Sequence, residues 1–245
     1  MSRSATTSVK RKTAIVTGTS DGLGFAIACH LVRQNFEVIG IARREMDPSA
    51  VGDGYLHVRA DLSQLDRLPA LCRELTRNRP APFALVNNAA GAIDGILPLT
   101  SDERISRAVD LDLVSPILLA KYLGRSMIAA GQGRIVNVSS VTARTGFRGL
   151  SVYSAAKAGL EGFTRSLAKD LGGRGVTVNC VAPGFLETQM TDAMSKQDMG
   201  RVRARSPLSR FATVDEVAAA VGYYLSAEAA GVTGTVLTVD AGATA

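Results

Sequence analysis

The chain has few of the residues that build metal sites and disulfide frameworks. Its three cysteines, Cys29, Cys72 and Cys180, are odd in number and far apart, and their spacing is not typical of a metal site. Its two histidines, His30 and His57, lie in segments expected to be packed helix or strand. The composition therefore excludes a disulfide-stabilised secreted domain and favours a reducing, cytoplasmic location. We expect no bound metal.

Tryptophan, internal repeats and low-complexity segments are also missing. Because no apolar run stands out as long enough to span a bilayer, we expect no membrane partner. Residues 1–11 are polar and basic, with no apolar stretch behind the charges, so they do not form a signal peptide. We expect them to form a flexible tail, and residues 12–245 to form one domain.

The chain has fewer acidic residues than basic ones, with 22 aspartates and glutamates against 28 lysines and arginines, so its formal net charge is +6 at pH 7. Such an excess favours acidic partners: a phosphorylated cofactor, an acidic carrier protein or nucleic acid. The arginines are scattered, and no nucleic-acid-binding motif accompanies them. We therefore expect no nucleic-acid partner.

What the chain does have is an alternation of short apolar runs and helical periodicity. The expected strands are residues 13–17, 36–42, 55–59, 83–87, 134–139, 176–181 and 235–239. Helices are expected between them, one capped by Ser63 and one running from 102 to 130 with a break near Pro116. This order predicts the α/β class: a single-domain Rossmann fold with a doubly wound parallel seven-stranded sheet and helices on both faces.

The first expected strand runs into a glycine-rich turn, Gly18-Thr-Ser-Asp-Gly22-Leu-Gly24, and then into a helix. Glycines let such a turn tighten and let the backbone approach a pyrophosphate, whose charge is received by the N–H groups that begin the helix. A plain strand-to-helix turn can look the same. Ligands of such sheets bind at the carboxyl ends of the strands, where Gly18, Asn87, Ser140 and Pro183 are expected.

A second motif combines Ser140, which follows the apolar run 135–138, with Tyr153 and Lys157. In a helix, residues four apart lie on one face, so the ammonium group can sit beside the phenol and favour its ionised form. Such a tyrosine can act as a general acid in carbonyl and alcohol chemistry. A tyrosine and lysine at this spacing can also be an ordinary surface pair.

Taken together, these motifs resemble the short-chain dehydrogenase/reductase family. The resemblance is carried by Thr17-Gly-Thr-Ser-Asp-Gly-Leu-Gly24, Asn87-Asn-Ala-Ala90, Ser140, Tyr153 with Lys157, and Pro183-Gly184. Within the family, the chain looks most similar to 3-oxoacyl-[acyl-carrier-protein] reductases, through the segments 153–160, 178–188 and 234–240.

The resemblance implies catalytic roles. Ser140 would hold the substrate carbonyl oxygen, Tyr153 would protonate it, and Lys157 would bind the cofactor ribose and assist the tyrosine. The family's spacing selects Ser140 over Ser139, which is expected to be a strand residue. Asp112 stands where the family usually has a catalytic asparagine, and an ionised aspartate has no amide protons to donate. We expect reductase activity to survive this change with an altered rate or pH profile.

The resemblance also implies a set of cofactor contacts. They are Gly18, Ser20, Asp21, Gly22, Leu23, Gly24, Arg43, Arg44, Asp61, Leu62, Asn87, Ala89, Tyr153, Lys157, Pro183, Gly184, Leu186 and Thr188. For Asp61, a cap at the start of the next helix is an alternative.

The residues after the second expected strand indicate which dinucleotide is bound. An acidic residue there would favour an unphosphorylated ribose, but the chain has Ala42 followed by Arg43 and Arg44. Arginine suits phosphate recognition, so we predict NADPH/NADP+, with Arg43 as the main contact. Two solvated surface arginines are the alternative. Asp21 departs from the basic residue that many NADPH users of this type carry in the glycine loop.

Residues 183–210 are expected to form a substrate lid, with Met190, Met194 and Met199 either lining an adaptable apolar wall or packing a short helix. The predicted function is NADPH-dependent reduction of a 3-oxoacyl thioester, carried on an acyl carrier protein, to the 3-hydroxyacyl form. Arg174 occupies a position where related reductases dock the carrier, whereas Gly131-Gln132 lacks the second expected base.

Two other functions remain open. One is a dehydrogenase or reductase of another ketone or alcohol, such as a sugar, polyol, steroid or small ketone. The other is a non-catalytic NADP(H)-sensing regulator. The expected helices 102–130 and 152–171 resemble the pair that forms tetramers in the family, so we expect a homotetramer.

Overall fold

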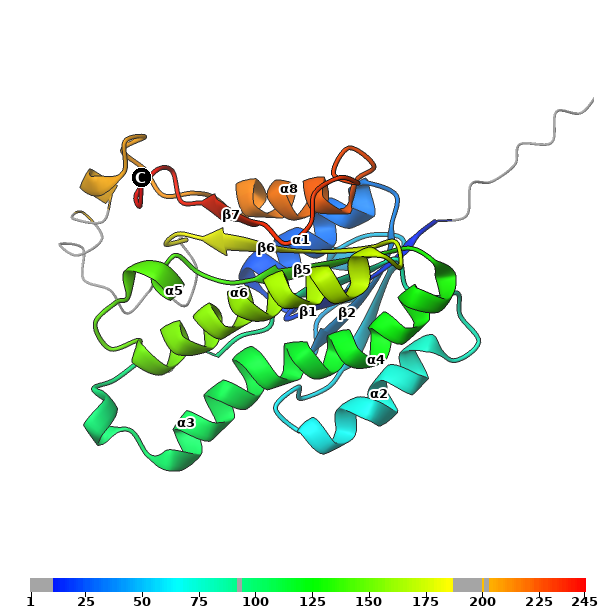
Figure 1. The fold of residues 1–245 in the computed structure, drawn as a ribbon, viewed down its shortest axis with the longest axis horizontal. Helices are drawn as coiled ribbons and strands as arrows, with labels where there is room; N and C mark the ends of the chain where they lie inside the picture. The colour runs from blue at the N-terminus through cyan, green and yellow to red at the C-terminus, as the bar shows by residue number, and fades with distance from the viewer. Residues whose placement is uncertain (1–10, 92–93, 187–199, 201–202) are drawn as a thin grey trace, which may run out of the picture.

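A computed structural model describes residues 11–91, 94–186, 200 and 203–245. Its centre is a sheet of seven parallel strands in the order β3-β2-β1-β4-β5-β6-β7, with helices on both faces (Figure 1). The strands are β1 Thr13–Thr17, β2 Glu37–Ala42, β3 Tyr55–Arg59, β4 Ala84–Asn87, β5 Gly133–Val138, β6 Val176–Pro183 and β7 Val236–Val239. The structure confirms the predicted doubly wound parallel sheet.

The central strands are mostly apolar because helices cover both of their faces. In β1, Ala14 and Val16 pack into the core on one face, while Ile15 packs into the core on the other. In β5, Val136 and Ile135 divide in the same way. This alternation sets the register of each strand against its neighbours.

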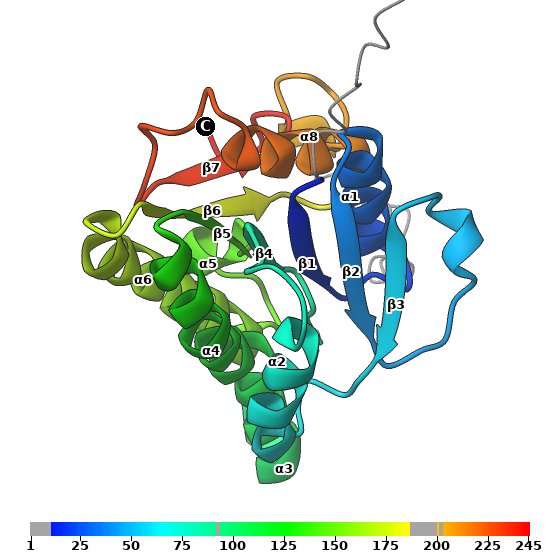
Figure 2. The same ribbon diagram turned by 90° about the vertical axis from the view of Figure 1, so that its right-hand side faces the viewer.

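Two groups of helices cover the sheet, as Figure 2 shows. Helices α1 Gly22–Arg33 and α8 Val214–Leu225 lie on one face. Helices α2 Leu68–Thr76, α4 Ser115–Ala130 and α6 Ser151–Gly172 lie on the other. The shorter helical segments are α3 Asp102–Val109, α5 Thr142–Thr145, and the single-turn segments η1 Pro48–Ala50, η2 Leu65–Arg67 and η3 Leu97–Leu99.

The helix expected at 102–130 is interrupted close to Pro116, as predicted. A π-helical segment, η4 Asp110–Val114, separates α3 from α4, and Pro116 lies in the first turn of α4. Proline is tolerated there because the first N–H groups of a helix have no intrahelical partner. The expected Ser63 cap is wrong, since Gln64 and Arg67 precede η2 and α2 and neither helix has a side-chain cap.

By length and mean hydropathy, the stretch Asp102–Ala130 would qualify as a membrane span, and 39% of its most apolar window is buried inside the molecule. A core helix of a globular protein meets the same criteria. Leu119, Leu123 and Met127 of α4 belong to the core between this helix and the sheet. The apolar character of the stretch is therefore accounted for by packing.

The strand order reverses between β1 and β4, where a crevice opens in sheets of this type. At this point Thr17 joins the two strands, because its Oγ1 accepts hydrogen bonds of 2.9 Å from the N–H groups of Asn88 and Ala89. Asn88 Nδ2 in turn donates to the Thr17 carbonyl oxygen at 2.9 Å. These bonds hold the two segments that follow the strands side by side.

The three cysteines are free thiols, as the sequence predicted. Burial raises the pKa of Cys72 to about 11 and that of Cys180 to about 12, so both stay protonated at neutral pH. Within the described residues, no three histidine, cysteine or acidic side chains lie close enough together to hold a metal.

Candidate active site

A cavity of about 860 Å³ lies at the carboxyl ends of the strands. Segments far apart in the sequence contribute to it: the glycine loop before α1, the segment after β2, and the segments after β4, β5 and β6. Most of the predicted site residues line it: Gly18, Ser20, Asp21, Gly22, Leu23, Gly24, Arg43, Arg44, Asp61, Leu62, Ala89, Ser140, Tyr153, Lys157, Pro183, Gly184 and Leu186. Thr188 and the three lid methionines lie outside the described residues.

The glycine loop packs tightly against the segment that follows β4. A Cβ added at Gly18 would lie 2.9 Å from Ala89 Cα and from Asn88 Nδ2, and one added at Gly24 would collide with the Gly18 carbonyl. Gly18 and Gly22 also have φ angles of 76° and 54°, which other residues rarely adopt. The loop can therefore take this course only with glycine at these positions.

Asp21 precedes α1, and its Oδ1 accepts a hydrogen bond from the Gly22 N–H at 2.6 Å. Its other oxygen lies 3.4 Å from Arg44 Nη2, while Arg44 Nε donates to Ser20 Oγ at 3.4 Å. Arg44 thus lies against the glycine loop and offsets the Asp21 charge at the helix N-terminus.

Arg43 and Arg44 follow Ala42, the last residue of β2, and all three line the cavity. In the described part of the chain, the Arg43 guanidinium has no ion-pair partner, although its charge acts on Asp61. Of the two arginines, Arg43 is therefore the one whose guanidinium is free to bind the 2′-phosphate that distinguishes NADPH from NADH.

Asp61 lines the cavity beyond β3 and does not cap a helix. Its Oδ1 accepts hydrogen bonds from Ser63 N at 3.0 Å and Ser63 Oγ at 2.7 Å, closing a local turn. Partial burial would raise its pKa, but the Ser63 hydrogen bonds and the Arg43 and Arg107 charges outweigh it and hold the pKa below its ordinary value. The carboxyl is therefore ionised at neutral pH.

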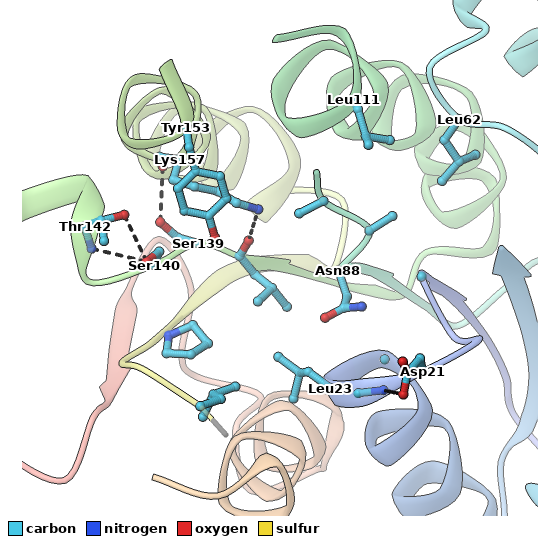
Figure 3. Close-up of a pocket in the computed structure, with 18 of the residues that line it drawn as sticks. Asp21, Leu23, Leu62, Asn88, Leu111, Ser139, Ser140, Thr142, Tyr153 and Lys157 are labelled. Atoms are coloured by element: carbon cyan, nitrogen blue, oxygen red, sulfur yellow. Dashed lines mark hydrogen bonds between the residues drawn. The ribbon is translucent and has the colours of Figure 1, made fainter. Parts of the chain in front are cut away.

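Tyr153 and Lys157 project from α6 into the cavity, with Ser140 across from them (Figure 3). Lys157 is only 2% exposed. Its Nζ donates a hydrogen bond of 2.9 Å to the Val138 carbonyl oxygen and lies 5.5 Å from the centre of the Tyr153 ring. The structure therefore places the ammonium and the phenol together at one site.

Ser140 directly follows the end of β5, and its Oγ accepts hydrogen bonds from Thr142 N at 3.2 Å and Thr142 Oγ1 at 3.0 Å. With its oxygen serving as acceptor, the hydroxyl proton is left to donate toward the cavity. Ser139 is buried instead and donates to the Lys157 carbonyl oxygen and to Glu161 Oε1, both at 3.2 Å. The two serines therefore differ in what they contact.

Two predicted site residues are not among those that line the cavity. Asn87 is 2% exposed, and its Nδ2 donates to Asn137 Oδ1 at 2.8 Å. Asp112 is fully buried in η4, and its Oδ1 accepts from Gly91 N at 2.8 Å. Burial raises the pKa of Asp112, against the opposing effects of the Lys157 charge and the Gly91 N–H.

Several lining residues had no signal in the sequence. Asn88, rather than Asn87, faces the cavity. Phe147 and Phe185 lie on separate loops and meet edge to face, with their ring centres 5.1 Å apart, and the exposed Arg148 follows. These residues lie in irregular segments, where no periodicity shows which way a side chain points.

Comparisons with known proteins agree with this geometry. The family described as Enoyl-(Acyl carrier protein) reductase matches residues 18–244. The 3-oxoacyl-[acyl-carrier-protein] reductase FabG of Vibrio cholerae is 38% identical over 235 residues, which cover 94% of this chain and 96% of the relative.

Two solved structures are also similar. A Beutenbergia cavernae protein described as an NAD(P)-dependent gluconate 5-dehydrogenase, with NADP bound at low occupancy, has a TM-score of 0.91 and 32% identity. The match covers 96% of this chain and 97% of that one. A protein described as a betaketoacyl-ACP reductase has a TM-score of 0.85 and 33% identity, with 94% and 97% covered.

Proposed function

The chain belongs to the short-chain dehydrogenase/reductase family, and we propose that it is an NADPH-dependent reductase of 3-oxoacyl thioesters carried on an acyl carrier protein. The product would be the 3-hydroxyacyl thioester. The observation that carries this proposal is that Tyr153, Lys157 and Ser140 share one cavity with the glycine loop and Arg43.

The residues present fit an NADP(H) molecule. The glycine loop brings its backbone to the cavity, and the start of α1 supplies N–H groups and positive dipole charge for a pyrophosphate. The segment after β2 supplies two arginines and no acid for a 2′-phosphate. The similar Beutenbergia cavernae structure holds NADP.

When bound, NADPH supplies the hydride that reduces the substrate carbonyl carbon. The Ser140 hydroxyl donates a hydrogen bond to the carbonyl oxygen and so orients the ketone. The Tyr153 hydroxyl gives its proton to the same oxygen as negative charge develops there. The Lys157 ammonium, fixed by the Val138 carbonyl, stabilises the phenolate that remains.

Support for a thioester substrate comes from two sources. The relatives matched over most of the chain include 3-oxoacyl-[acyl-carrier-protein] reductases. In addition, Phe147 and Phe185 form an apolar wall of the cavity, which suits an acyl chain. Arg174 is exposed in the turn between α6 and β6 and would meet an acidic carrier protein.

A steady-state assay with carrier-linked and coenzyme A-linked 3-oxoacyl substrates tests the function. We expect reduction with NADPH at a kcat/KM well above that with NADH, and loss of turnover in Tyr153→Phe. A preference for NADH would contradict the cofactor. Binding of NADPH without turnover of any ketone, unchanged by Tyr153→Phe, would identify a cofactor-sensing regulator.

A second candidate is the oxidation of a sugar acid or a similar small alcohol. It is favoured by the similarity to the Beutenbergia cavernae protein and by Arg148, an exposed cation that lines the cavity. A carboxylate on the substrate would pair with this arginine. Oxidation of gluconate with NADP+, weakened at least severalfold by Arg148→Gln, would favour this candidate over the thioester.

We further propose that residues 12–245 act as one catalytic domain, with residues 183–210 as the substrate lid. Residues 1–10 of the expected tail, and 187–199 and 201–202 of the expected lid, lie outside the described residues. We also propose a cytoplasmic homotetramer. Sedimentation of the purified chain tests the assembly, and limited proteolysis with and without NADPH tests the tail and the lid.

A further inference from the structure

The edge strand β3 presents three polar side chains on one face. Tyr55, His57 and Arg59 are two residues apart, so they point to the same side of the sheet, while Leu56 and Val58 point to the other. β3 pairs only with β2 among the described strands and lies at the sheet margin (Figure 2). The three side chains are therefore free to reach the segment that leaves the end of β2.

Each of the three contacts that segment. His57 Nε2 lies 3.0 Å from the carbonyl oxygen of Arg44. Arg59 Nε donates to the carbonyl oxygen of Arg43 at 3.1 Å. The Tyr55 hydroxyl oxygen also lies 3.4 Å from Met46 Sδ. Two of these contacts hold the backbone of the two arginines that border the cavity.

Tyr55 also connects the segment to the glycine loop. Its hydroxyl lies 2.8 Å from Oγ1 of Thr19, a loop residue with no exposed surface, and 3.0 Å from His57 Nδ1. The Tyr55 ring crosses β2 at Gly40, where an added Cβ would collide with the ring and its hydroxyl. Glycine at this position of β2 thus makes room for the connection.

The direction of these hydrogen bonds follows from the Arg44 carbonyl oxygen, at which they end. A carbonyl oxygen only accepts, so neutral His57 carries its proton on Nε2 and accepts at Nδ1. Tyr55 then donates to His57, and Thr19 donates to Tyr55. The result is one chain of hydrogen bonds from the glycine loop to the Arg44 backbone, while the Arg44 side chain returns to Ser20 and Asp21.

We propose that Tyr55, His57 and Arg59, here called the β3 brace, are positioning residues that hold the Arg43–Arg44 segment so that Arg43 can bind the 2′-phosphate of the dinucleotide. The inference rests on the proposed NADPH dependence. A segment held in place before binding loses less conformational entropy when it meets the phosphate. The brace therefore increases affinity for ligands that carry a 2′-phosphate, without touching them.

Calorimetry with two nucleotide fragments tests the brace on the full-length protein without substrate. Adenosine 2′,5′-bisphosphate carries the 2′-phosphate, and 5′-AMP lacks it. We expect His57→Leu to weaken binding of the bisphosphate about three- to tenfold, the usual range for one net hydrogen bond. Binding of 5′-AMP should change less than twofold. His57→Gln should restore most of the affinity, because its amide N–H can reach the Arg44 carbonyl.

Matched variants separate a positioning role from damage to the strand. Leu56→Ala changes the same strand on its opposite, exposed face and should leave both affinities unchanged. If His57→Leu folds poorly, Tyr55→Phe removes a single hydroxyl and serves in its place. Unchanged bisphosphate binding, or an equal loss for both fragments, overturns the brace.

Failure of the proposed cofactor gives a different result. Wild-type protein would then bind the two fragments equally, and Arg43→Ala would change neither affinity. If Arg43→Ala selectively weakens binding of the bisphosphate while His57→Leu does not, the cofactor proposal stands and the β3 brace is excluded.

Discussion

The Lys157 ammonium donates a hydrogen bond of 2.9 Å to the carbonyl oxygen of Val138, the last residue of β5. This bond ties α6 to the strand that leads into Ser140, so the lysine and the serine are positioned by one contact. Lys157 is among the largest fully buried side chains of the molecule. Burying the Lys157 ammonium costs free energy that an apolar side chain of the same size would not cost. Packing alone therefore does not account for a lysine at this position.

Replacing Lys157 by methionine removes this charge while keeping most of the side-chain volume. We expect kcat to fall at least about 100-fold, the lower range for loss of acid–base assistance. The unpartnered Val138 carbonyl should also lower the free energy of unfolding by about 1–3 kcal/mol. Lys169→Met, at an exposed position later in α6, is the control. Activity of Lys157→Met within threefold of wild type would exclude the proposed role.

Asp112→Asn should increase stability in a pH-dependent way. Burial raises the pKa of Asp112 in the folded chain, so ionising this carboxyl costs more in the folded state than in the unfolded state. The stability of the wild type therefore begins to fall once the pH exceeds the ordinary aspartate pKa near 4. The loss grows until the pH reaches the pKa of the folded state. The amide does not titrate. The difference in Tm between variant and wild type should therefore be small at pH 4 and increase toward pH 8. A difference in Tm that stays constant from pH 4 to pH 8 would contradict a raised pKa of Asp112 in the folded chain.

Much of the fold follows from local sequence, because buried parallel strands are continuous apolar runs. The expected strands 13–17 and 55–59 match β1 and β3, and the others differ at their ends by one or two residues. The π-helical segment η4 and the short helix α5 have no comparable signal. Their backbone is set by packing between distant elements, which single-sequence periodicity does not record.

The site was predictable where a motif ties residue type to a fixed position. The glycine loop, Tyr153 and Lys157 line one cavity because their helix and turn geometry is local, while their roles there stay predictions. Asn87 and Asn88, at the end of β4, differ in the direction of their side chains. The Asn87 side chain is held away from the cavity by its hydrogen bond to Asn137, and the Asn88 side chain lines the cavity. The sequence indicated only packing for His57, since its partner, the Arg44 carbonyl, belongs to another strand's end.

Arg144 and Glu161 should show energetic coupling. Arg144 Nε lies 3.2 Å from Glu161 Oε2, joining α5, which follows Ser140, to α6, which carries Tyr153 and Lys157. The Glu161 side chain is 6% exposed and that of Arg144 48%. We expect Glu161→Gln to cost about 1–3 kcal/mol and Arg144→Met less, because Arg165 Nη1 lies 3.9 Å from Glu161 Oε2 and still partners the carboxylate when Arg144 is lost. The double variant should cost less than both changes added together, and strict additivity in urea unfolding would contradict the pair.

Glu216 should contribute to stability only above acidic pH. It accepts from Thr213 N in the capping box and from Arg210 at 2.6 and 2.8 Å. The Arg210 hydrogen bonds, followed by the Thr213 N–H, lower its pKa from 4.5 to about 2. Folding therefore favours the ionised form, and its contribution is complete above about pH 4.5 and is lost as the pH falls toward 2. Glu216→Gln should lower Tm at pH 7 but have little effect near pH 2.

Asp21→Asn should strengthen the preference for NADPH. Asparagine can still cap α1 by accepting from Gly22 N, but it removes the negative charge beside the expected phosphates and releases Arg44 from its 3.4 Å ion pair. We expect KM for NADPH to fall about two- to fivefold, in the range of a partly exposed ion pair, with a smaller change for NADH. Asp53→Asn, an exposed acid outside the cavity, controls for net charge. An equal effect on both cofactors would show that the Asp21 charge acts on the pyrophosphate, and not through Arg44.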